Sequence, residues 1–181
     1  MDCSVQLWLD SEIGAKWRSG EFNVNVIKAL GVDQLLPKRV KKLSGGERQA
    51  VSIAICLGRD ADLYLLDEPS AHLDANARME AAKAIRKTME SNEKSALVID
   101  HDVYFIDILS DSLLVFEGDG GHYGKATGPY SLRDGMNRFL KGVNITFRRD
   151  HDSKRPRINK LESRKDREQQ SSGDFYSFES K

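Results

Sequence analysis

Two adjacent carboxylates follow a short apolar run, and this pattern could do phosphate chemistry. The run LYLL covers residues 63–66, and Asp67 and Glu68 come directly after it. At the carboxyl edge of a parallel sheet, where α/β proteins bind ligands, one carboxylate can hold Mg²⁺ while the other polarises an attacking water. By itself the pattern also fits an ordinary acidic turn at a strand end, so other residues must decide.

A serine and two glycines at a predicted helix start form a second candidate site. Ser44 is a good N-cap residue, and Glu47 completes a capping box three residues later. Gly45 and Gly46 leave backbone N–H groups open to an anion at the positive end of the helix dipole. A capping box accounts for Ser44 and Glu47 but not for the glycine pair, so we interpret the motif as a phosphate site.

A histidine between two aspartates gives a third candidate. Asp100, His101 and Asp102 lie at the end of the second apolar run, SALVID. If both runs are parallel strands, His101 lies on the same sheet edge as Asp67 and Glu68. A lone histidine is usually structural, but a histidine beside carboxylates at a strand end is a candidate for sensing or orienting a phosphate.

The elements that position these residues follow from the spacing of apolar side chains. We predict helices over about 21–30, 45–58, 75–90, 103–109 and 131–141, strands over 63–66, 95–100 and 112–118, and a short helix or a fragment of one within 1–19. Alternating helices and continuously apolar strands predict an α/β fold with a parallel sheet covered on both faces. GDGGHYG at 118–124 is predicted to be a turn, residues 146–160 show no periodicity, and the chain is expected to be mobile from about Ser163.

Composition limits the class of protein. The 181 residues suggest one domain, and two cysteines exclude a disulfide framework, a CxxC zinc site and a four-cysteine iron–sulfur site within the chain. No apolar run reaches the length of a membrane span, so we expect a cytoplasmic protein without a membrane partner. Residues 1–140 carry 17 basic and 21 acidic side chains and residues 141–181 carry 11 and 7, so the tail is basic.

Together these motifs resemble the ATP-binding cassette family. LSGGERQ resembles its signature motif, LYLLDE its Walker B strand, SAHLD its D-loop and His101 its switch histidine, in the family's order. The resemblance implies that Glu68 is the general base, Asp67 the Mg²⁺ site, His101 the γ-phosphate sensor and Asp74 the D-loop link between cassettes. It also implies a head-to-tail sandwich with a second cassette, in which Ser44, Gly45, Gly46 and Glu47 contact the ATP held by that cassette.

The phosphate loop of that family, GxxxxGK[ST], is absent from the sequence. Gly124-Lys125 comes nearest, but Ala126 follows, and we interpret the segment as a turn. The chain is therefore expected to be the C-terminal half of a cassette that needs a partner half, with its own phosphate loop N-terminal to Met1. Residues 1–42 would be a remnant of the helical subdomain, 43–141 the motif-bearing part, and 142–181 a basic hinge and polar tail.

Several further segments resemble the ribosome-recycling ATPases, also called RNase L inhibitor proteins. These segments are PSAHLD, GMNRFL, ITFRRD, RPRINK and KDREQQSSGDFY. The resemblance implies coupling of ATP binding and hydrolysis to ribosomal subunit splitting, with the ribosome and its small subunit as partners. Iron–sulfur clusters are expected in the full-length family but not in this chain. His72 stands where that family usually has tyrosine, and Asp100 stands where glutamate is common.

The basic hinge and two rival functions remain open at this point. The hinge cations would join the two cassettes, and they would either approach ribosomal RNA or pack within the protein. They are Arg148, Arg149, Arg155, Arg157 and Lys160. One rival is a non-catalytic binding module that competes for a partner cassette. The other is an ATPase subunit of a transporter or a DNA-repair complex, but a repair head needs a long heptad-patterned helix before the signature, which residues 1–42 do not provide.

Overall fold

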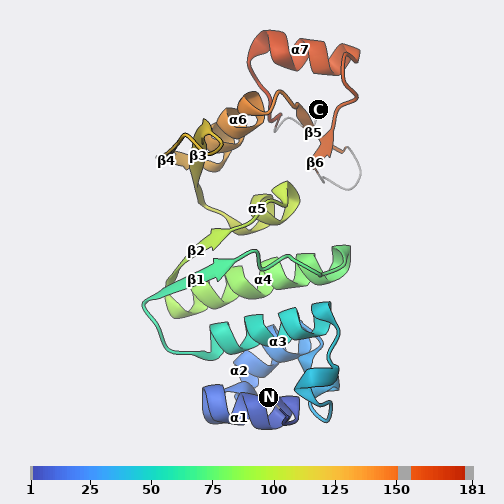
Figure 1. The fold of residues 1–181 in the computed structure, drawn as a ribbon, viewed down its shortest axis with the longest axis vertical. Helices are drawn as coiled ribbons and strands as arrows, with labels where there is room; N and C mark the ends of the chain where they lie inside the picture. The colour runs from blue at the N-terminus through green and yellow to red at the C-terminus, as the bar shows by residue number, and fades with distance from the viewer. Residues whose placement is uncertain (1, 151–155, 178–181) are drawn as a thin grey trace. The chain divides into compact units, whose positions relative to one another are not determined.

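A computed structural model describes residues 2–150 and 156–177 of the chain (Figure 1). The fold divides into two compact units, residues 1–109 and residues 110–181. Within the described residues, no helix is both long enough and apolar enough to cross a membrane. The three-part functional division at residues 42/43 and 141/142 stays a prediction, because the two compact units rest on packing alone.

The N-terminal part of the first unit is helical. Its elements are α1 (Val5–Ile13), η1 (Gly14–Arg18), α2 (Gly20–Phe22), the π-helix η2 (Asn23–Lys28), η3 (Val32–Leu35) and η4 (Val40–Lys42). The helix predicted over 21–30 is thus present as α2 and η2, and Gly31 after it takes a left-handed φ of 67°. Val5, Leu9, Val26 and Ile27 are almost fully buried, which ties these short helices to the core of the unit.

The motif-bearing part of the first unit is a parallel strand pair with helices. α3 (Gly45–Gly58), β1 (Leu63–Asp67), α4 (Ala75–Asn92), β2 (Ser95–Ile99) and α5 (Val103–Leu109) follow in that order. β1 pairs with β2 in parallel, from Leu63 opposite Ser95 to Asp67 opposite Ile99. Ala81, Ala82 and Ile85 on α4 are buried, and Met89 is partly buried against the same core. The α/β class with a parallel sheet flanked by helices is therefore confirmed.

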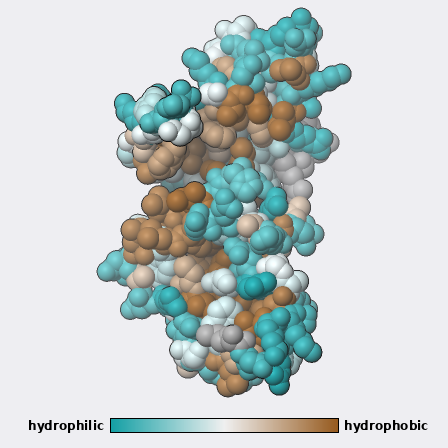
Figure 2. Space-filling view, in the orientation of Figure 1, coloured by the Kyte–Doolittle hydropathy of each residue, from teal (hydrophilic) through white to brown (hydrophobic). Residues whose placement is uncertain are grey.

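The described residues cover only one face of this strand pair, which corrects the expectation of a sheet covered on both faces. Tyr64 and Leu66 point into the core and are buried. Leu63, Leu65, Leu97 and Ile99 are 45% to 67% exposed on the opposite face. Figure 2 shows hydrophobic side chains gathered on the surface at the level of β1 and β2. Parallel sheets are normally covered on both faces, so an exposed apolar face on a parallel pair is unusual.

The second unit contains a hairpin, and this corrects two predictions. β3 (Ser112–Asp119) pairs antiparallel with β4 (Tyr123–Ser131), and in the part of the chain that the structure describes the third predicted strand has no partner other than β4, so it forms a hairpin and not a third parallel strand. β4 begins at Tyr123, so Gly124 and Lys125 lie on a strand, and the turn is shorter than predicted. The sequence YGKATGPYS has no apolar alternation, and β4 exists because its backbone pairs with β3.

The C-terminal residues are ordered around the predicted helix at 131–141, which is α6 (Leu132–Gly142). β5 (Phe147–Arg149) pairs antiparallel with β6 (Pro156–Ile158), and α7 (Arg164–Ser172) follows. For residues 163–177 the expectation of a mobile chain is wrong, and residues 178–181 lie outside the described residues. Ser163 caps α7, the Phe147 N–H donates to the Phe175 carbonyl at 2.7 Å, and Tyr176 is only 1% exposed. Tertiary contacts outweigh the polar composition of this segment.

Candidate nucleotide site

The signature segment, residues 43–49, begins α3 as predicted. The Ser44 hydroxyl accepts a hydrogen bond from the Glu47 N–H at 3.2 Å, and the Glu47 carboxylate accepts one from the Ser44 N–H at 3.0 Å. Lys38 pairs with Glu47 at 2.7 Å, and this hydrogen bond lowers the pKa of the Glu47 carboxyl. Glu47 is thus committed to the cap and to Lys38, while Ser44 and Gly45 are exposed at the helix start.

The glycine pair has a packing role that the sequence did not reveal. A Cβ atom on Gly46 would lie 2.8 Å from the backbone oxygen of His72, and one on Gly45 would lie 3.3 Å from Cγ of the His72 ring. His72 itself has a φ of 63°, in the left-handed region. The start of α3 therefore packs directly on the loop between β1 and α4. Absence of a side chain at Gly46 is required by this contact, independently of any phosphate.

Asp67 and Glu68 lie at the carboxyl end of β1, and both side chains are exposed. The Glu68 N–H donates to the Ile99 carbonyl at 2.7 Å, which extends the pairing with β2 by one residue. Glu68 has a φ of 45°, a conformation that costs energy in a residue with a side chain and that persists when the surroundings enforce it. The Gln49 side chain from α3 donates to the Glu68 and Pro69 carbonyls at 3.3 and 3.2 Å.

His101 lies beside Glu68, as the sequence predicted from the two strand ends. Nδ1 of His101 is 3.9 Å from Oε1 of Glu68, and their side chains are 78% and 58% exposed. Asp102 caps α5, because its carboxylate accepts from the Tyr104 and Phe105 N–H groups, and it also pairs with Arg78 at 2.7 Å. The two groups assigned to base and sensor are therefore adjacent and open to solvent.

Two residues of the site have mainly structural contacts in this chain. Asp74 caps α4, and its carboxylate accepts from the Asn76 and Ala77 N–H groups at 2.9 Å each. Asp100 bonds Ser70, and both of its carboxylate oxygens are used. Sequence reasoning missed the contributions of Gln49, Ser70 and Asp100. Their partners are 19 to 30 residues away, so no local pattern could have found these bonds.

The residues present fit a Mg²⁺ site of the kind that nucleotides complete. Among the described residues, no group of three or more His, Cys, Asp or Glu side chains is placed to hold a metal ion. Mg²⁺ is commonly bound through one or two carboxylates together with substrate phosphates, so a full cage of protein ligands is not needed. Asp67 supplies a hard oxygen donor at an exposed strand end, which is the chemistry that such a site requires.

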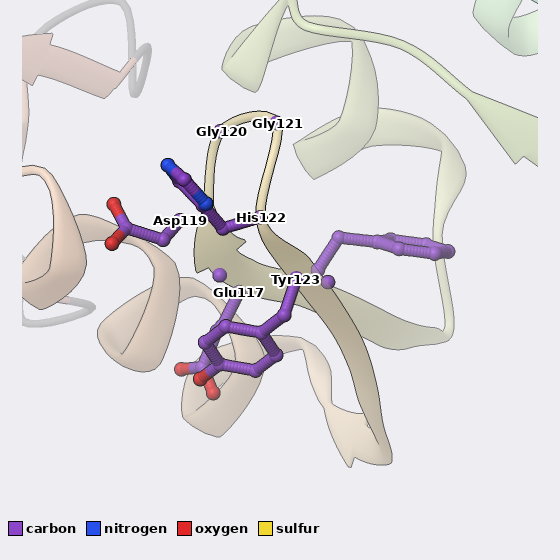
Figure 3. Close-up of a pocket in the computed structure, with 9 residues that line it drawn as sticks. Glu117, Asp119, Gly120, Gly121, His122 and Tyr123 are labelled. Carbon is purple, nitrogen blue, oxygen red and sulfur yellow. The ribbon is translucent and has the colours of Figure 1, made fainter.

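A separate hollow of about 520 Å³ lies at the tip of the β3–β4 hairpin in the second unit. Figure 3 shows the Asp119, His122 and Tyr123 side chains spreading outward from this tip and not converging on one point. Glu117 beside them is bound by Arg138 through two hydrogen bonds of 2.7 Å. None of the predicted site residues lines this hollow.

Comparison with known proteins identifies the family. A model described as ABC transporter matches residues 10–71. The chain is 45% identical, over 97% of its length, to ABC transporter E family member 1 of Arabidopsis thaliana, and 45% identical, over 91%, to translation initiation factor RLI1 of Saccharomyces cerevisiae. A solved archaeal ribosome recycling factor aABCE1, in complex with the ribosomal stalk protein aP1, matches 98% of the chain with 50% identity and a TM-score of 0.91.

This chain belongs to the E family of ATP-binding cassette proteins.

The E-family match covers only part of each relative. The chain spans 29% of the Arabidopsis protein, 27% of the yeast protein and 34% of the aABCE1 chain. The match to aABCE1 extends through nearly the whole chain, so it includes the hairpin and the C-terminal segment that the ABC transporter model leaves unmatched. The C-terminal resemblance noted in the sequence is thereby confirmed at the level of the family.

Proposed function

We propose that this chain is the signature- and Walker B-bearing part of a ribosome-recycling ATPase that couples ATP binding and hydrolysis to subunit splitting. One observation carries the proposal: Glu68 and His101 lie 3.9 Å apart, in the loops that follow two neighbouring parallel strands. Ligands of α/β proteins bind at this edge. The names of two relatives, a translation initiation factor and a ribosome recycling factor, support the ribosome as partner and the cytoplasm as location. Binding to the small subunit is part of the same proposal.

In this proposal each side chain has a distinct task. Glu68 accepts a proton from the attacking water, and general bases of this kind contribute roughly 10²–10⁴-fold to a rate. His101 donates from its imidazole to a γ-phosphate oxygen and so orients the phosphate against that water. Asp67, together with phosphate oxygens, would hold Mg²⁺, which neutralises negative charge on the phosphates when bound.

The signature segment serves a different phosphate in this proposal. Ser44, Gly45 and Gly46 contact the γ-phosphate of ATP held by a second cassette in a head-to-tail sandwich. The exposed start of α3 supports this assignment, because backbone N–H groups and the helix dipole favour an anion there. Asp74 lies in the loop that would face the second cassette, although its carboxylate is already used to cap α4.

The proposal includes a partner half-cassette that supplies the phosphate loop. The sequence contains no GxxxxGK[ST], so the β- and γ-phosphates lack the backbone cradle and lysine on which phosphoryl transfer depends. The exposed apolar face of β1 and β2, formed by Leu63, Leu65, Leu97 and Ile99, supports the same conclusion. This face is where further strands or a helix of a complete cassette would pack.

Steady-state ATP hydrolysis tests the proposal. We expect the purified chain to hydrolyse ATP at background level, and a mixture with a separately expressed half-cassette that carries GxxxxGK[ST] to turn over ATP. Glu68→Gln in that mixture is the matched control and should slow turnover by roughly 10²–10⁴-fold. Turnover by the chain alone that Glu68→Gln removes would contradict the need for a partner half. Tight binding to a partner cassette without any turnover in the mixture would favour the non-catalytic binding module instead.

The trans role of the signature segment needs a variant that spares its packing. Gly46→Asp would add charge near the phosphate, but it would also collide with the His72 carbonyl, so it cannot separate the two effects. Gly45 is better, because the nearest atoms to a Cβ there belong to the His72 side chain, which can move. Gly45→Asp should reduce ATP occlusion at the site that contains the second cassette's phosphate loop. Loss confined to the other site would contradict the trans assignment.

The basic hinge is proposed to pack within the protein and to join the two cassettes. Arg157 pairs with Asp150 at 3.0 Å, and Arg149 bonds the Tyr176 hydroxyl at 3.3 Å, which supports intramolecular packing. Lys160 is exposed, and Arg155 lies outside the described residues. Contact with ribosomal RNA stays a prediction, and a filter-binding assay with ribosomal RNA and a Lys160→Glu variant would test it.

A further inference from the structure

The loops that carry Glu68 and His101 are joined to each other at two points. The first is the hydrogen bond from the Glu68 N–H to the Ile99 carbonyl, at 2.7 Å. The second involves Asp100 and Ser70: Oδ2 of Asp100 accepts from the Ser70 N–H at 3.0 Å, and Oδ1 accepts from the Ser70 hydroxyl at 2.8 Å. Ser70 is only 2% exposed, so this second point lies inside the protein.

Asp100 also shapes the backbone around His101. Its Oδ1 accepts from the Asp102 N–H at 2.9 Å, two residues further along the chain. This is the hydrogen bond of an Asx turn, and His101 is its central residue. Among the described residues, the 3.9 Å approach to Glu68 is the one polar contact of the His101 side chain. The direction of the exposed imidazole is therefore set largely by the backbone turn that carries it.

We propose that Asp100 is a positioning residue that fixes the His101 turn against the Glu68 loop and so sets the separation of sensor and base; this rests on the function proposed above. Ser70 is two residues after Glu68, and Asp100 is one residue before His101. The Asp100 carboxylate thus accepts two hydrogen bonds that connect the two loops and a third, from the Asp102 N–H, that closes the turn around His101.

The length and charge of the side chain at position 100 matter for this arrangement. A glutamate adds a methylene group, which moves its oxygens away from the i to i+2 geometry of an Asx turn. An asparagine keeps one acceptor oxygen for the turn and for the Ser70 hydroxyl, but its NH₂ group faces the Ser70 N–H, where a donor finds no acceptor. Asp100→Asn is therefore expected to keep the turn and to lose one of the three bonds, whereas Asp100→Ala loses all three.

The first experiment measures the hydrogen bonds that Asp100 accepts from Ser70 and Asp102, in the 181-residue chain and without nucleotide. Amide hydrogen exchange followed by NMR should show protected Ser70 and Asp102 N–H groups in the parent. Asp100→Ala should expose both, and Ser70→Ala should leave the Asp102 N–H protected. The Glu68 N–H, bonded to Ile99, and the amides of α4 report that the unit remains folded. Solvent-like exchange of Ser70 and Asp102 in the parent would overturn the inference.

The second experiment measures the consequence for hydrolysis, in the mixture with the half-cassette that supplies the phosphate loop. We expect Asp100→Ala to lower kcat by roughly 10- to 100-fold, as misplacement of about 1 Å in a reacting group can do. The KM for ATP should change less than about twofold, because the phosphates are held elsewhere. Asp100→Asn should recover most of the kcat.

The outcomes separate this inference from the function on which it rests. If Asp100→Ala keeps the parental kcat while Glu68→Gln loses it, the positioning role is wrong and the proposed function stands. If Glu68→Gln also keeps the parental kcat, the assignment of the base fails, and the positioning role fails with it. Equal loss in kcat and rise in KM for Asp100→Ala would show general damage to the unit and would likewise overturn the inference.

Discussion

The two units of this protein stabilise themselves and place their polar groups in opposite ways. The first unit has a large apolar core that includes Val5, Leu9, Leu57 and Ile85, while its candidate functional groups are exposed at strand and helix ends. The second unit has a smaller apolar interior, and it also buries three polar side chains that hydrogen-bond to one another. Thr146, Asn159 and Asp166 are 0%, 7% and 3% exposed.

The buried polar groups of the second unit form one hydrogen-bonded network. The Thr146 hydroxyl donates to the Asp166 carboxylate at 2.5 Å and accepts from the Asn159 amide at 2.9 Å. Asp166 also accepts from the Glu162 N–H and the Gln170 amide. Such a network holds segments in one arrangement when every member is satisfied. The exposed polar groups of the first unit can therefore be explained by ligand chemistry. The buried polar groups of the second unit instead hold its segments in one fold.

The largest effect should come from the first unit. Glu68→Gln, in the mixture with a phosphate-loop half, should slow ATP hydrolysis by roughly 10²–10⁴-fold and leave ATP binding intact. The stability of the first unit should not change, because the Glu68 side chain is 58% exposed. Single-turnover hydrolysis and nucleotide retention measure the two properties. Parental turnover in the variant would break the comparison, since Glu68 would then have no chemical role.

The second unit should respond to a core truncation in stability alone. Tyr176 is 1% exposed, and its N–H donates to the Asn137 side chain at 2.9 Å. Tyr176→Ala removes a buried ring and should cost about 3–5 kcal/mol of the stability of the second unit. Tyr176→Phe, the matched control, loses only the hydroxyl that Arg149 contacts. Amide exchange resolved by unit measures both, and equal losses in the two variants would show that the ring is not the stabilising group.

Removal of the Thr146 hydroxyl, which links Asp166 and Asn159, should lower the stability of the second unit. Thr146→Val keeps the shape but leaves Asp166 and Asn159 with an unpaired buried group, which should cost about 1–3 kcal/mol. Thr146→Ser, which keeps the hydroxyl, is the control. Guanidinium unfolding followed by a probe in the second unit gives the difference. If Thr146→Val left the free energy of unfolding unchanged, the hydroxyl would contribute nothing to stability that water cannot replace.

Acid should act on the same network. The hydrogen bond from Thr146 lowers the pKa of the Asp166 carboxyl below its ordinary 3.8. On acidification the unfolded chain therefore binds the proton first, so the stabilisation is complete well above pH 3.8 and is lost as the pH falls below it towards the lowered pKa. The stability of the second unit should fall more steeply in this range for the parent than for Thr146→Val. Identical pH profiles for the parent and Thr146→Val would show that the bond between Thr146 and Asp166 does not cause the loss of stability in acid.

The smallest effects should come from two helix caps, and they compare the units directly. Ser44 caps α3 and Ser163 caps α7, each through its side chain. Ser44→Ala and Ser163→Ala should each cost about 1 kcal/mol in their own unit. Only Ser44→Ala should also weaken ATP occlusion with a second cassette. Loss of occlusion in both variants, or in neither, would leave Ser44 as an ordinary cap.

The sequence by itself determined most elements of the motif-bearing part of the first unit and where its candidate site residues lie on them. The capping box needs only Ser44 and Glu47, and an apolar run ending in Asp67 and Glu68 is enough to mark a strand end. These signals lie within a few residues, because helix caps, turns and strand periodicity are set by local hydrogen bonds and by side-chain direction. The α/β class, the order of its elements and the adjacency of His101 to Glu68 followed from them.

Only the tertiary structure decided the rest. β4 has no apolar alternation and exists as the partner of β3. Residues 163–177 are ordered despite their polar composition, because the Phe147 N–H bonds the Phe175 carbonyl and Tyr176 is buried. The packing of Gly46 on His72 and the bonds of Asp100 to Ser70 likewise join residues 26 to 30 positions apart. Hydrogen bonds and close contacts of this range form only after the chain has folded, so no pattern of neighbouring residues encodes them.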